Sequence, residues 1–312
     1  MNRATKSLRL MGTVIDLSIE DELAEELLAE AAAKLAVYEH RFSANDPASE
    51  LMAVNQHAGV RPVVVHSELF DLIKIGKAHS LAANSNLNIA IGPLVQTWRI
   101  GFKDAKVPTP EEVKERLEKT NPYNIILNEA EQSVYLTETG MAIDLGCLAK
   151  GYIADLLAED FRKRSVQAAL INLGGNIMAV GPPAKRNKNY WAVGVQNPSQ
   201  PRNAYDVLLK VADQSVVTSG IYERQLQTNQ ANYHHILDPK TGYPCQTDVV
   251  SLTIVSDHSV DGEIWTTRLF GKPADFIIQT LDQLPGIDGL VITETGEKIY
   301  SKGLLTAIKN YE

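Results

Sequence analysis

The chain has 312 residues, of which 44% are hydrophobic and 22% are charged, so it has material for a sizeable core and is not disordered. Its formal net charge is -8 and no basic stripe runs along it, which argues against a nucleic-acid backbone as the main partner. Its two cysteines, Cys147 and Cys245, form no CxxC pair and are too few for a secreted disulfide framework, so we expect both to be reduced and buried.

The sequence predicts no transmembrane segment, because it contains no run of about 18 apolar residues. Residues 1–20 include basic side chains but pass into strand-like alternation without the apolar centre of a signal peptide. We therefore expect a cytoplasmic protein. The alternative is an exported, membrane-anchored protein whose leader is missing from this sequence.

The first half of the chain mixes short strands with helices. The patterns predict a strand at 8–19, helices at 21–42 and 49–55, a strand at 63–65, helices at 67–83 and 109–119, and a hairpin formed by YNIILN and QSVYLTE. The helix at 109–119 has Pro110 in its first turn, where a missing N–H costs little. Residues 89–102 are interrupted by a Gly-Pro break.

The second half is richer in glycine and in hairpin-like strands. The patterns predict a strand, a tight turn and an amphipathic helix over 141–164, a buried strand broken by a double glycine over 168–181, strands at YWAVGVQNP, AYDVLLKV, VVTSGIYERQ and VVSLTIVSD, helices at 259–270 and 274–284, and strands at 289–295 and 298–300. Helices are not regularly interleaved with strands, and no repeat or linker marks a boundary. We therefore predict an α+β fold with mixed or antiparallel sheets and flanking helices, in a single domain over residues 1–312.

Two glycine turns are candidates for phosphate binding. DLGCLAKG (144–151) and NLGGN (172–176) each place glycines at a predicted strand end, where a backbone without Cβ turns tightly and approaches a ligand. The first also leads into a helix whose free N–H groups attract anions. A purely structural turn fits as well, because the spacing matches neither a Walker loop nor GxGxxG.

Two further segments carry polar groups at predicted strand ends. In VVTSGIYERQ, the hydroxyls of Thr218 and Ser219 stand before a glycine, and Glu223 follows; these groups suit a nucleobase or ribose, and equally a capped turn. In HHILDPKTGYP, a histidine doublet lies in a polar turn with acids further along the chain. A lone histidine is usually structural, but this arrangement favours proton transfer near neutral pH.

Glu263 and Thr267 stand four residues apart on a predicted helix, so both side chains face the same way. A carboxylate and a hydroxyl are hard oxygen ligands, suited to Mg²⁺ bound together with substrate phosphates. A solvated helix face is the alternative, because this spacing also occurs by chance.

The order of the motifs adds to these separate signals. The motifs are MGT at 11–13, FSxxxxxSELxxxN at 42–55, GPLVxxW at 92–98, DLGxxAKGYxAD at 144–155, NLGGN, TSGxYER and HHILDPKTGYP. In this order they resemble the ApbE family, the FAD:protein FMN transferases, over about residues 8–271. The resemblance implies an ApbE-like fold with a T-fold-like core.

The resemblance also implies an activity. Enzymes of this family bind FAD, cleave its pyrophosphate with Mg²⁺, release AMP, and attach FMN through a phosphodiester bond to a threonine or serine hydroxyl of a target flavoprotein. The acceptor threonine lies in a DGxTG-type segment, and this chain has no such segment, so the expected acceptor is another protein. Two alternatives stay open: a Mg²⁺-dependent FAD pyrophosphatase that gives FMN and AMP, and a non-catalytic FAD-binding protein.

By similarity, the metal ligands are the backbone carbonyl of Ala149, the carboxylate of Glu263 and the hydroxyl of Thr267. The family usually has Asp where this chain has Glu263; Asp261 is the competing acid, but its partner four residues on is Trp265, which does not ligate a metal. His235 matches the reactive histidine, which activates the acceptor hydroxyl or orients an acid that does so.

The resemblance places FAD along several other residues. The isoalloxazine ring is expected against Met11 and the segment from Ser43 to Asn55, with Asn55 donating hydrogen bonds. Lys150 is expected to shape the AKG turn with Asp144 or to reach a phosphate, and Asp238 to fix its own turn. Asn88 and Asn176 stand where the family often has Asp. The adenine and ribose end is expected against Asn172, Gly174, Gly175, Thr218, Ser219 and Glu223.

Overall fold

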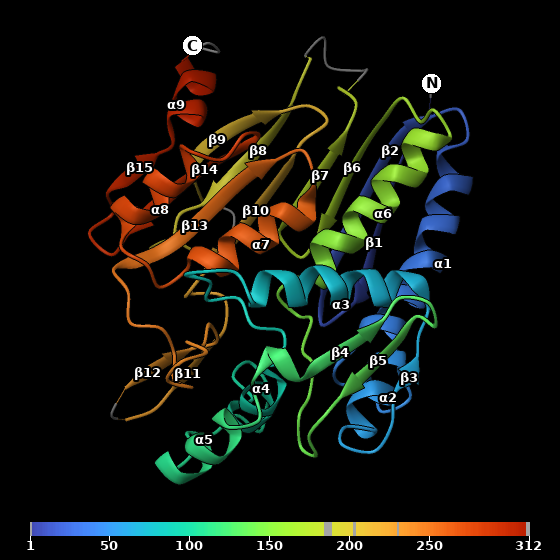
Figure 1. The fold of residues 1–312 in the computed structure, drawn as a ribbon. Helices are drawn as coiled ribbons and strands as arrows, with labels where there is room; N and C mark the ends of the chain where they lie inside the picture. The colour runs from blue at the N-terminus through green and yellow to red at the C-terminus, as the bar shows by residue number, and fades with distance from the viewer. Residues whose placement is uncertain (1, 184–188, 202–203, 230, 310–312) are drawn as a thin grey trace.

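The computed structural model describes residues 2–183, 189–201, 204–229 and 231–309, and its centre is one eight-stranded sheet (Figure 1). The strand order is β1-β2-β6-β7-β10-β13-β14-β15, and neighbouring strands run antiparallel. The strands are β1 Asn2–Leu10, β2 Thr13–Asp21, β6 Ala168–Leu173, β7 Asn176–Val180, β10 Ser215–Gly220, β13 Val249–Ser256, β14 Ile287–Thr293 and β15 Lys298–Tyr300. The predicted α+β class with antiparallel sheets is thus confirmed.

Helices cover one face of this sheet. They are α1 Ala24–Phe42, α6 Ala149–Lys163, α7 Ser259–Leu269 and α8 Ala274–Leu281. Leu17 of β2 and Met178 of β7 pack there against Leu35 of α1 and Phe161 of α6 in the largest apolar cluster. A neighbouring cluster joins α7 and α8 to β13 and β14. Burial of these alternating side chains fixes which face of each strand looks toward α6 and α7.

The opposite face carries a β-hairpin and the last helix. The hairpin strands are β8 Trp191–Gln196 and β9 Tyr205–Val211, and the helix is α9 Lys302–Lys309. Trp191 packs there with Val216 of β10 and Val255 of β13. Because both faces of the central strands are covered, their sequences read as almost continuous apolar runs.

Smaller elements form a second layer at one end of the sheet, seen in the lower part of Figure 1. They are α2 Glu50–Gln56, β3 Val63–Val64, α3 Ser67–Ser80, α4 Gly92–Trp98, α5 Pro110–Leu117, the 3₁₀ turn Pro122–Asn124, β4 Ile125–Asn128, β5 Ser133–Leu136, β11 Gln225–Gln227 and β12 Asn232–His234. As expected, α2 starts after Ser49, whose hydroxyl accepts the N–H of Met52. The helix predicted at 109–119 is also present as α5, and the structure shows that it begins with a capping box between Thr109 and Glu112.

Two sequence predictions about secondary structure are wrong. The single strand at 8–19 is a hairpin, because Met11 (φ 55°) and Gly12 (φ 69°) form a left-handed turn between β1 and β2. The strand that should begin at Met141 is irregular chain. There, both the N–H and the C=O of Ile143 bond the side-chain amide of Asn55 instead of a neighbouring strand.

Both cysteines are free, as predicted, but only Cys245 is buried; Cys147 is half-buried. Within the described ranges, no helix has the length and apolarity needed to cross a bilayer.

Candidate active site

Glu263 is a buried carboxylate at the meeting point of three segments. It lies on α7 with 4% of its surface exposed. Its Oε1 accepts a hydrogen bond from Asn176 Nδ2 of β7 at 2.6 Å and another from Lys150 Nζ of α6 at 3.1 Å. Asn176, itself 3% exposed, is therefore one of the residues that fix this carboxylate, a role that the sequence did not reveal.

The position of α7 is set by α6. The two carboxylate oxygens of Asp155 accept the backbone N–H groups of Ser259 and Val260 at 2.7 and 2.8 Å, which caps the N-terminus of α7. The helices also approach closely: a Cβ added to Gly151 would lie 2.5 Å from the carbonyl oxygen of Ser259 and 2.7 Å from Glu263 Cγ. Gly151 is therefore required for the contact between these helices.

The three residues expected to ligate a metal lie on this pair of helices. Ala149 and Lys150 are the first two residues of α6, and Thr267 is half-buried one turn after Glu263 on α7. In the part of the chain that the structure describes, no group of three or more His, Cys, Asp and Glu side chains suits a metal ion. A set of one carboxylate, one hydroxyl and one carbonyl fits a hard cation such as Mg²⁺, which takes few protein ligands and fills its shell with waters and phosphate oxygens.

His235 follows β12 and is half-buried, with Nδ1 at 3.3 Å from the carbonyl oxygen of Arg224. Burial, the charge of Arg224 and, less strongly, the charge of Lys150 lower the pKa of His235 to about 4. The ring is thus neutral at pH 7 and able to accept a proton. His234 has a structural role, because its ring bonds the carbonyl oxygen of Cys245 through Nε2 and the N–H of Ile236 through Nδ1.

The loop that carries His235 is held by α4. Trp98, 1% exposed, donates its Nε1–H to the carbonyl oxygen of Gly242 at 2.8 Å. Its ring lies 5.3 Å from that of Tyr233 and 5.8 Å from that of Tyr243. Within the loop, Asp238 Oδ1 accepts the N–H of Lys240, so Asp238 fixes the turn as expected. The tryptophan of the GPLVxxW motif is therefore an anchor for the histidine loop.

Charges of both signs surround the ammonium of Lys150. Asp144 lies before α6, and its Oδ1 accepts the N–H of Gly146 at 2.7 Å. Burial raises the pKa of Asp144, against the opposing effects of that hydrogen bond and of the charges of Arg224 and Lys150. Lys150 is in contact with Glu263. The charges of Lys150 and Arg224 both act on Asp144 and on His235, so these groups are electrostatically linked to the start of α6.

One of the residues expected around the flavin ring, Ser43, lines a hollow, and Met11 bonds another residue of its lining. The N–H of Met11 donates to Glu39 Oε1 at 2.6 Å, and the hydroxyl of Ser43 accepts the N–H groups of Asn45 and Asp46. A cavity of about 300 Å³ is lined by Ala36, Glu39, His40, Ser43, Asn45 and Asp46. The side-chain amide of Asn55 bonds the backbone N–H and C=O of Ile143. Its expected hydrogen bond to the flavin stays a prediction.

Most of the residues expected around the nucleotide lie at one end of two neighbouring strands, because the NLGGN turn precedes β7 and the antiparallel register of β7 with β10 puts that turn beside Thr218 and Ser219. Gly174 packs on Thr13 and donates its N–H to the carbonyl oxygen of Val14, so the NLGGN turn lies beside the Met11 turn. Asn172 Oδ1 accepts the N–H of Gly175 within that turn.

Thr218 and Ser219 are adjacent on β10, so their side chains point to opposite faces of the sheet. The hydroxyl of Thr218 is 2.9 Å from that of Thr253, on the face away from α7. Ser219 points toward the α7 face, and Glu223 is exposed beyond the end of β10. The structure thus does not bring the whole predicted nucleotide set onto one surface.

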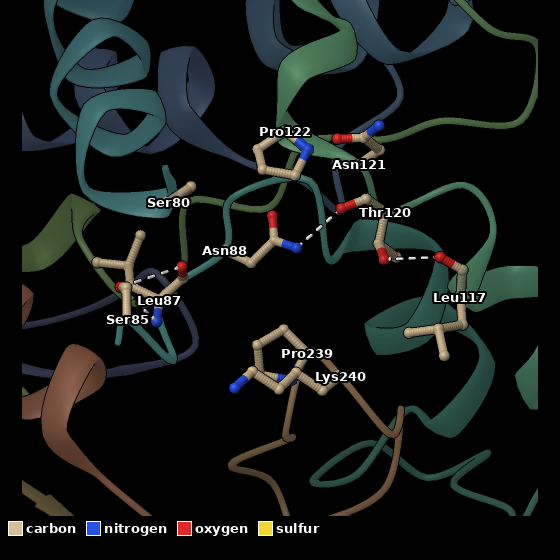
Figure 2. A pocket seen from close by; sticks show the side chains of 10 residues that line it. All are labelled: Ser80, Ser85, Leu87, Asn88, Leu117, Thr120, Asn121, Pro122, Pro239 and Lys240. Carbon is tan, nitrogen blue, oxygen red and sulfur yellow. Dashed lines mark hydrogen bonds between the residues drawn. The ribbon is translucent and has the colours of Figure 1, made fainter. Parts of the chain in front are cut away.

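A separate cavity of about 290 Å³ lies between the end of α3, the loop after α5 and the tip of the histidine loop (Figure 2). It is lined by Ser80, Ser85, Leu87, Asn88, Leu117, Thr120, Asn121, Pro122, Pro239 and Lys240. Asn88 is buried there, and its amide donates to the carbonyl oxygen of Thr120 and accepts the N–H of Ala90. Its amide thus bonds backbone groups at two points of the chain.

Besides Asn176, three further positions matter to the site and were not predicted to do so. Asp155 caps α7, Gly151 allows the helix contact, and Trp98 anchors the histidine loop. All three stand inside motifs that were recognised, which was the available signal. Their partners are more than 100 residues away in the chain, up to 144 for Trp98 and Gly242, so the sequence alone did not reveal what they touch.

Comparison with known proteins finds relatives along most of the chain. Residues 11–291 match the model of the ApbE family. A Klebsiella pneumoniae protein named FAD:protein FMN transferase is 40% identical over 293 residues, which cover 94% of this chain and 90% of that protein. A Treponema pallidum protein of the same name is 34% identical over 86% of this chain and 77% of its own length.

Solved structures show the same fold. The crystal structure of the ApbE protein from Thermotoga maritima superposes with a TM-score of 0.88 at 25% identity, covering 98% of this chain and 99% of that one. The flavin transferase ApbE from Vibrio cholerae gives a TM-score of 0.83 at 23% identity, with the same coverage of both chains.

Proposed function

The chain belongs to the ApbE family, and from that premise we propose how it works as an FAD:protein FMN transferase. In this proposal it uses Mg²⁺ to move FMN from FAD onto a threonine or serine hydroxyl of another flavoprotein, in a DGxTG-type segment, and releases AMP. The observation that supports it best is Glu263: a buried carboxylate one helical turn from Thr267 and beside the start of α6.

The residues of α6 and α7 hold the diphosphate end of FAD. Glu263, Thr267 and the carbonyl of Ala149 would hold Mg²⁺, which supplies positive charge that neutralises the pyrophosphate as its bond breaks. Lys150 contributes a second positive charge from the first turn of α6. Positioning and charge neutralisation are the main requirements of phosphoryl transfer, and this end of the site provides both.

His235 acts on the acceptor. Its neutral ring, with a pKa of about 4, takes the proton of the acceptor hydroxyl. The hydroxyl oxygen then bonds to the FMN phosphorus, and the bond from that phosphorus to the oxygen shared with AMP breaks. FMN ends as a phosphodiester on the acceptor, and AMP leaves with the bridging oxygen.

The direct test combines the purified chain, FAD, Mg²⁺ and a flavoprotein with a DGxTG-type segment. Intact mass should show the addition of FMN less water, and EDTA should abolish it. Release of FMN and AMP with no mass gain, with acceptor present, would instead show a pyrophosphatase. FAD binding without turnover, insensitive to EDTA, would show a flavin carrier. The compartment expected for the reaction remains the cytoplasm, which fractionation of cells that produce the protein would check.

A further inference from the structure

Glu263 is paired with the positive charge of Lys150. The ammonium of Lys150 lies 3.1 Å from Glu263 Oε1, and the two side chains are 26% and 5% exposed, respectively. A buried carboxylate without a partner is strongly destabilising. A cation is therefore needed beside Glu263, and in the structure Lys150 provides it.

We propose that Lys150 is an internal placeholder for the metal: its ammonium neutralises Glu263 in the ligand-free protein and is displaced when a divalent cation binds. This inference rests on the proposed function, because it takes the cation to be Mg²⁺. It gives Lys150 two successive roles, first at the carboxylate and then at the phosphates of FAD.

The first support is the difference in charge between the two groups that bond the carboxylate of Glu263. Glu263 Oε1 accepts one hydrogen bond from the neutral amide of Asn176 and one from the charged ammonium of Lys150. A divalent cation on the same carboxylate repels the ammonium and does not repel the amide in the same way. Asn176 can therefore remain in place while Lys150 leaves.

The second support is the difference in exposure within the pair. Glu263 is enclosed between β7 and the α6–α7 contact, whereas about a quarter of the Lys150 side chain reaches solvent. Lys150 can thus move its ammonium by changing rotamers, and Glu263 cannot follow it. The mobile partner of this pair is the lysine.

The third support is the place where the ammonium lies. Lys150 is the second residue of α6, where the helix dipole disfavours a cation and favours an anion. Its Nζ is also 3.4 Å from the carbonyl oxygen of Gly146, and its charge affects the pKa values of Asp144 and His235. Once released from Glu263, the ammonium remains near the start of α6, where a phosphate group is attracted.

Replacing Lys150 therefore has two effects of opposite sign. In Lys150→Met, the competitor is gone, so the FAD-free protein should bind a divalent cation more tightly than the wild type. With FAD present, the phosphate loses a positive partner, so transfer at saturating metal should be slower. A lysine that merely orients Glu263 would give weaker metal binding and slower transfer together.

The experiment measures cation binding without catalysis. Mn²⁺ is titrated into FAD-free wild type, Lys150→Met and Lys163→Met, and the free ion is followed by its electron paramagnetic resonance signal. We expect the Kd for Mn²⁺ to fall about tenfold in Lys150→Met, within the usual range for coupled sites. Lys163→Met is the matched control, because it removes an exposed lysine of the same helix, paired with Glu159, and should leave Kd unchanged.

Folding is checked in the same samples. Lys150→Met should unfold at a lower urea concentration than wild type without metal, and saturating Mg²⁺ should restore more stability to it than to wild type. Lys150→Gln is a second variant, which keeps a hydrogen-bond donor for Glu263 without the charge. Its Kd for Mn²⁺ should also be lower than that of wild type.

The outcomes separate the two proposals. If wild type binds Mn²⁺ and Lys150→Met binds it equally or more weakly, the placeholder role is overturned and the transferase proposal stands. If wild type binds no Mn²⁺ with or without FAD, and EDTA leaves transfer unchanged, the metal part of the proposed function fails and the placeholder role fails with it.

Discussion

The carboxylate of Asp155 accepts the backbone N–H of Ser259 at 2.7 Å, across 104 positions of sequence. A second bond, from the N–H of Val260, completes the cap, so one side chain of α6 determines where α7 begins. Since α7 carries Glu263 and Thr267, and α6 carries Ala149 and Lys150, this cap sets the relative position of the four groups expected at the diphosphate.

Asp155 should make stability depend on pH. Burial raises its pKa to about 6, above the ordinary value of 3.8, so the folded protein holds this proton more tightly than the unfolded chain. The resulting stabilisation is full below about pH 4 and is lost as the pH rises through 6. In urea titrations from pH 4 to 7, Asp155→Asn should lack this decrease, whereas Asp160→Asn on the same helix should keep it. Parallel curves for wild type and Asp155→Asn would contradict the assignment.

Removing the cap on α7 altogether should lower the stability of the protein and displace α7. Asp155→Ala leaves two N–H groups at the start of α7 without their partner, and loss of such a cap costs about 1 kcal/mol, within a range of about 0.5–2 kcal/mol. We expect a lower urea midpoint and a higher Mg²⁺ requirement for transfer, because Glu263 and Thr267 shift with the helix. An unchanged Mg²⁺ requirement would show that α7 is positioned by its packing alone.

Glu263→Gln keeps the shape of the side chain and removes its charge. FMN transfer should fall by about 10²-fold or more, the scale on which loss of one electrostatic group acts in an active site. Asp261→Asn is the matched control two residues earlier. Burial raises the pKa of Asp261, and the charges that act on it most are those of His258, His79 and Asp257, none of which is expected to bind the metal; the charge of Asp261 in turn raises the pKa of Asp155. Equal losses in the two variants would argue against a specific role for Glu263.

His235 should determine the acid limb of the rate profile. With a pKa near 4, its ring is already neutral at pH 6, so kcat/KM should rise between about pH 3 and 5 and stay level to pH 8. His235→Gln should lose the transfer and the limb while still binding FAD, as measured by flavin fluorescence. His234→Gln should lower stability through the lost contact with Cys245 and leave the limb at the same pH. A limb near 6.5 would place the essential base elsewhere.

Asn176→Asp should set two buried carboxylates against each other. The Asn176 amide is 2.6 Å from Glu263 Oε1, so an aspartate there replaces a donor by a like charge. At neutral pH and without metal, we expect a loss of about 3 kcal/mol in the free energy of unfolding, the scale of an uncompensated buried charge. Saturating Mg²⁺ should recover part of it.

Asn176→Ala serves as the comparison for that variant. It removes the hydrogen bond without adding charge and should cost about 1 kcal/mol, with little recovery on addition of Mg²⁺. The same loss and the same recovery in both variants would mean that the charge of the new aspartate is not what matters.

Local sequence patterns predicted most of the helices and strands, because the spacing of apolar residues in the sequence matches the side chains that are buried in the structure. The starts of α2 and α5 were predicted from Ser49 and Pro110, which are local signals, and the structure adds the Thr109–Glu112 capping box to the second. The spacing of Glu263 and Thr267 similarly predicted that both lie on one side of α7, and α7 is where the structure has them.

The failures share one cause, which is that the deciding partner is distant in sequence. The turn at Met11 interrupts an alternation that continues on both sides of it, so the pattern reads as one strand. The chain at Ile143 is extended but bonds the side chain of Asn55, 88 positions earlier, in place of a strand. In the same way, the exchange of aspartate for asparagine at Asn176 had no interpretation until its contact with Glu263 was seen.

The histidine loop contacts two apolar clusters: Ile236 packs against the cluster of α7 and α8, and Leu237 lies in the smaller cluster of α4 and α5. Leu237 of the loop packs with Trp98, Leu94 and Val113 from α4 and α5, whereas α7 packs on the central sheet. Substitutions in the small cluster can therefore tilt the loop, and with it the approach of the acceptor, while the FAD end keeps its shape. Substitutions around Leu237 and substitutions around Glu263 should therefore have separable effects, the first on the expected approach of the acceptor and the second on the expected binding of FAD.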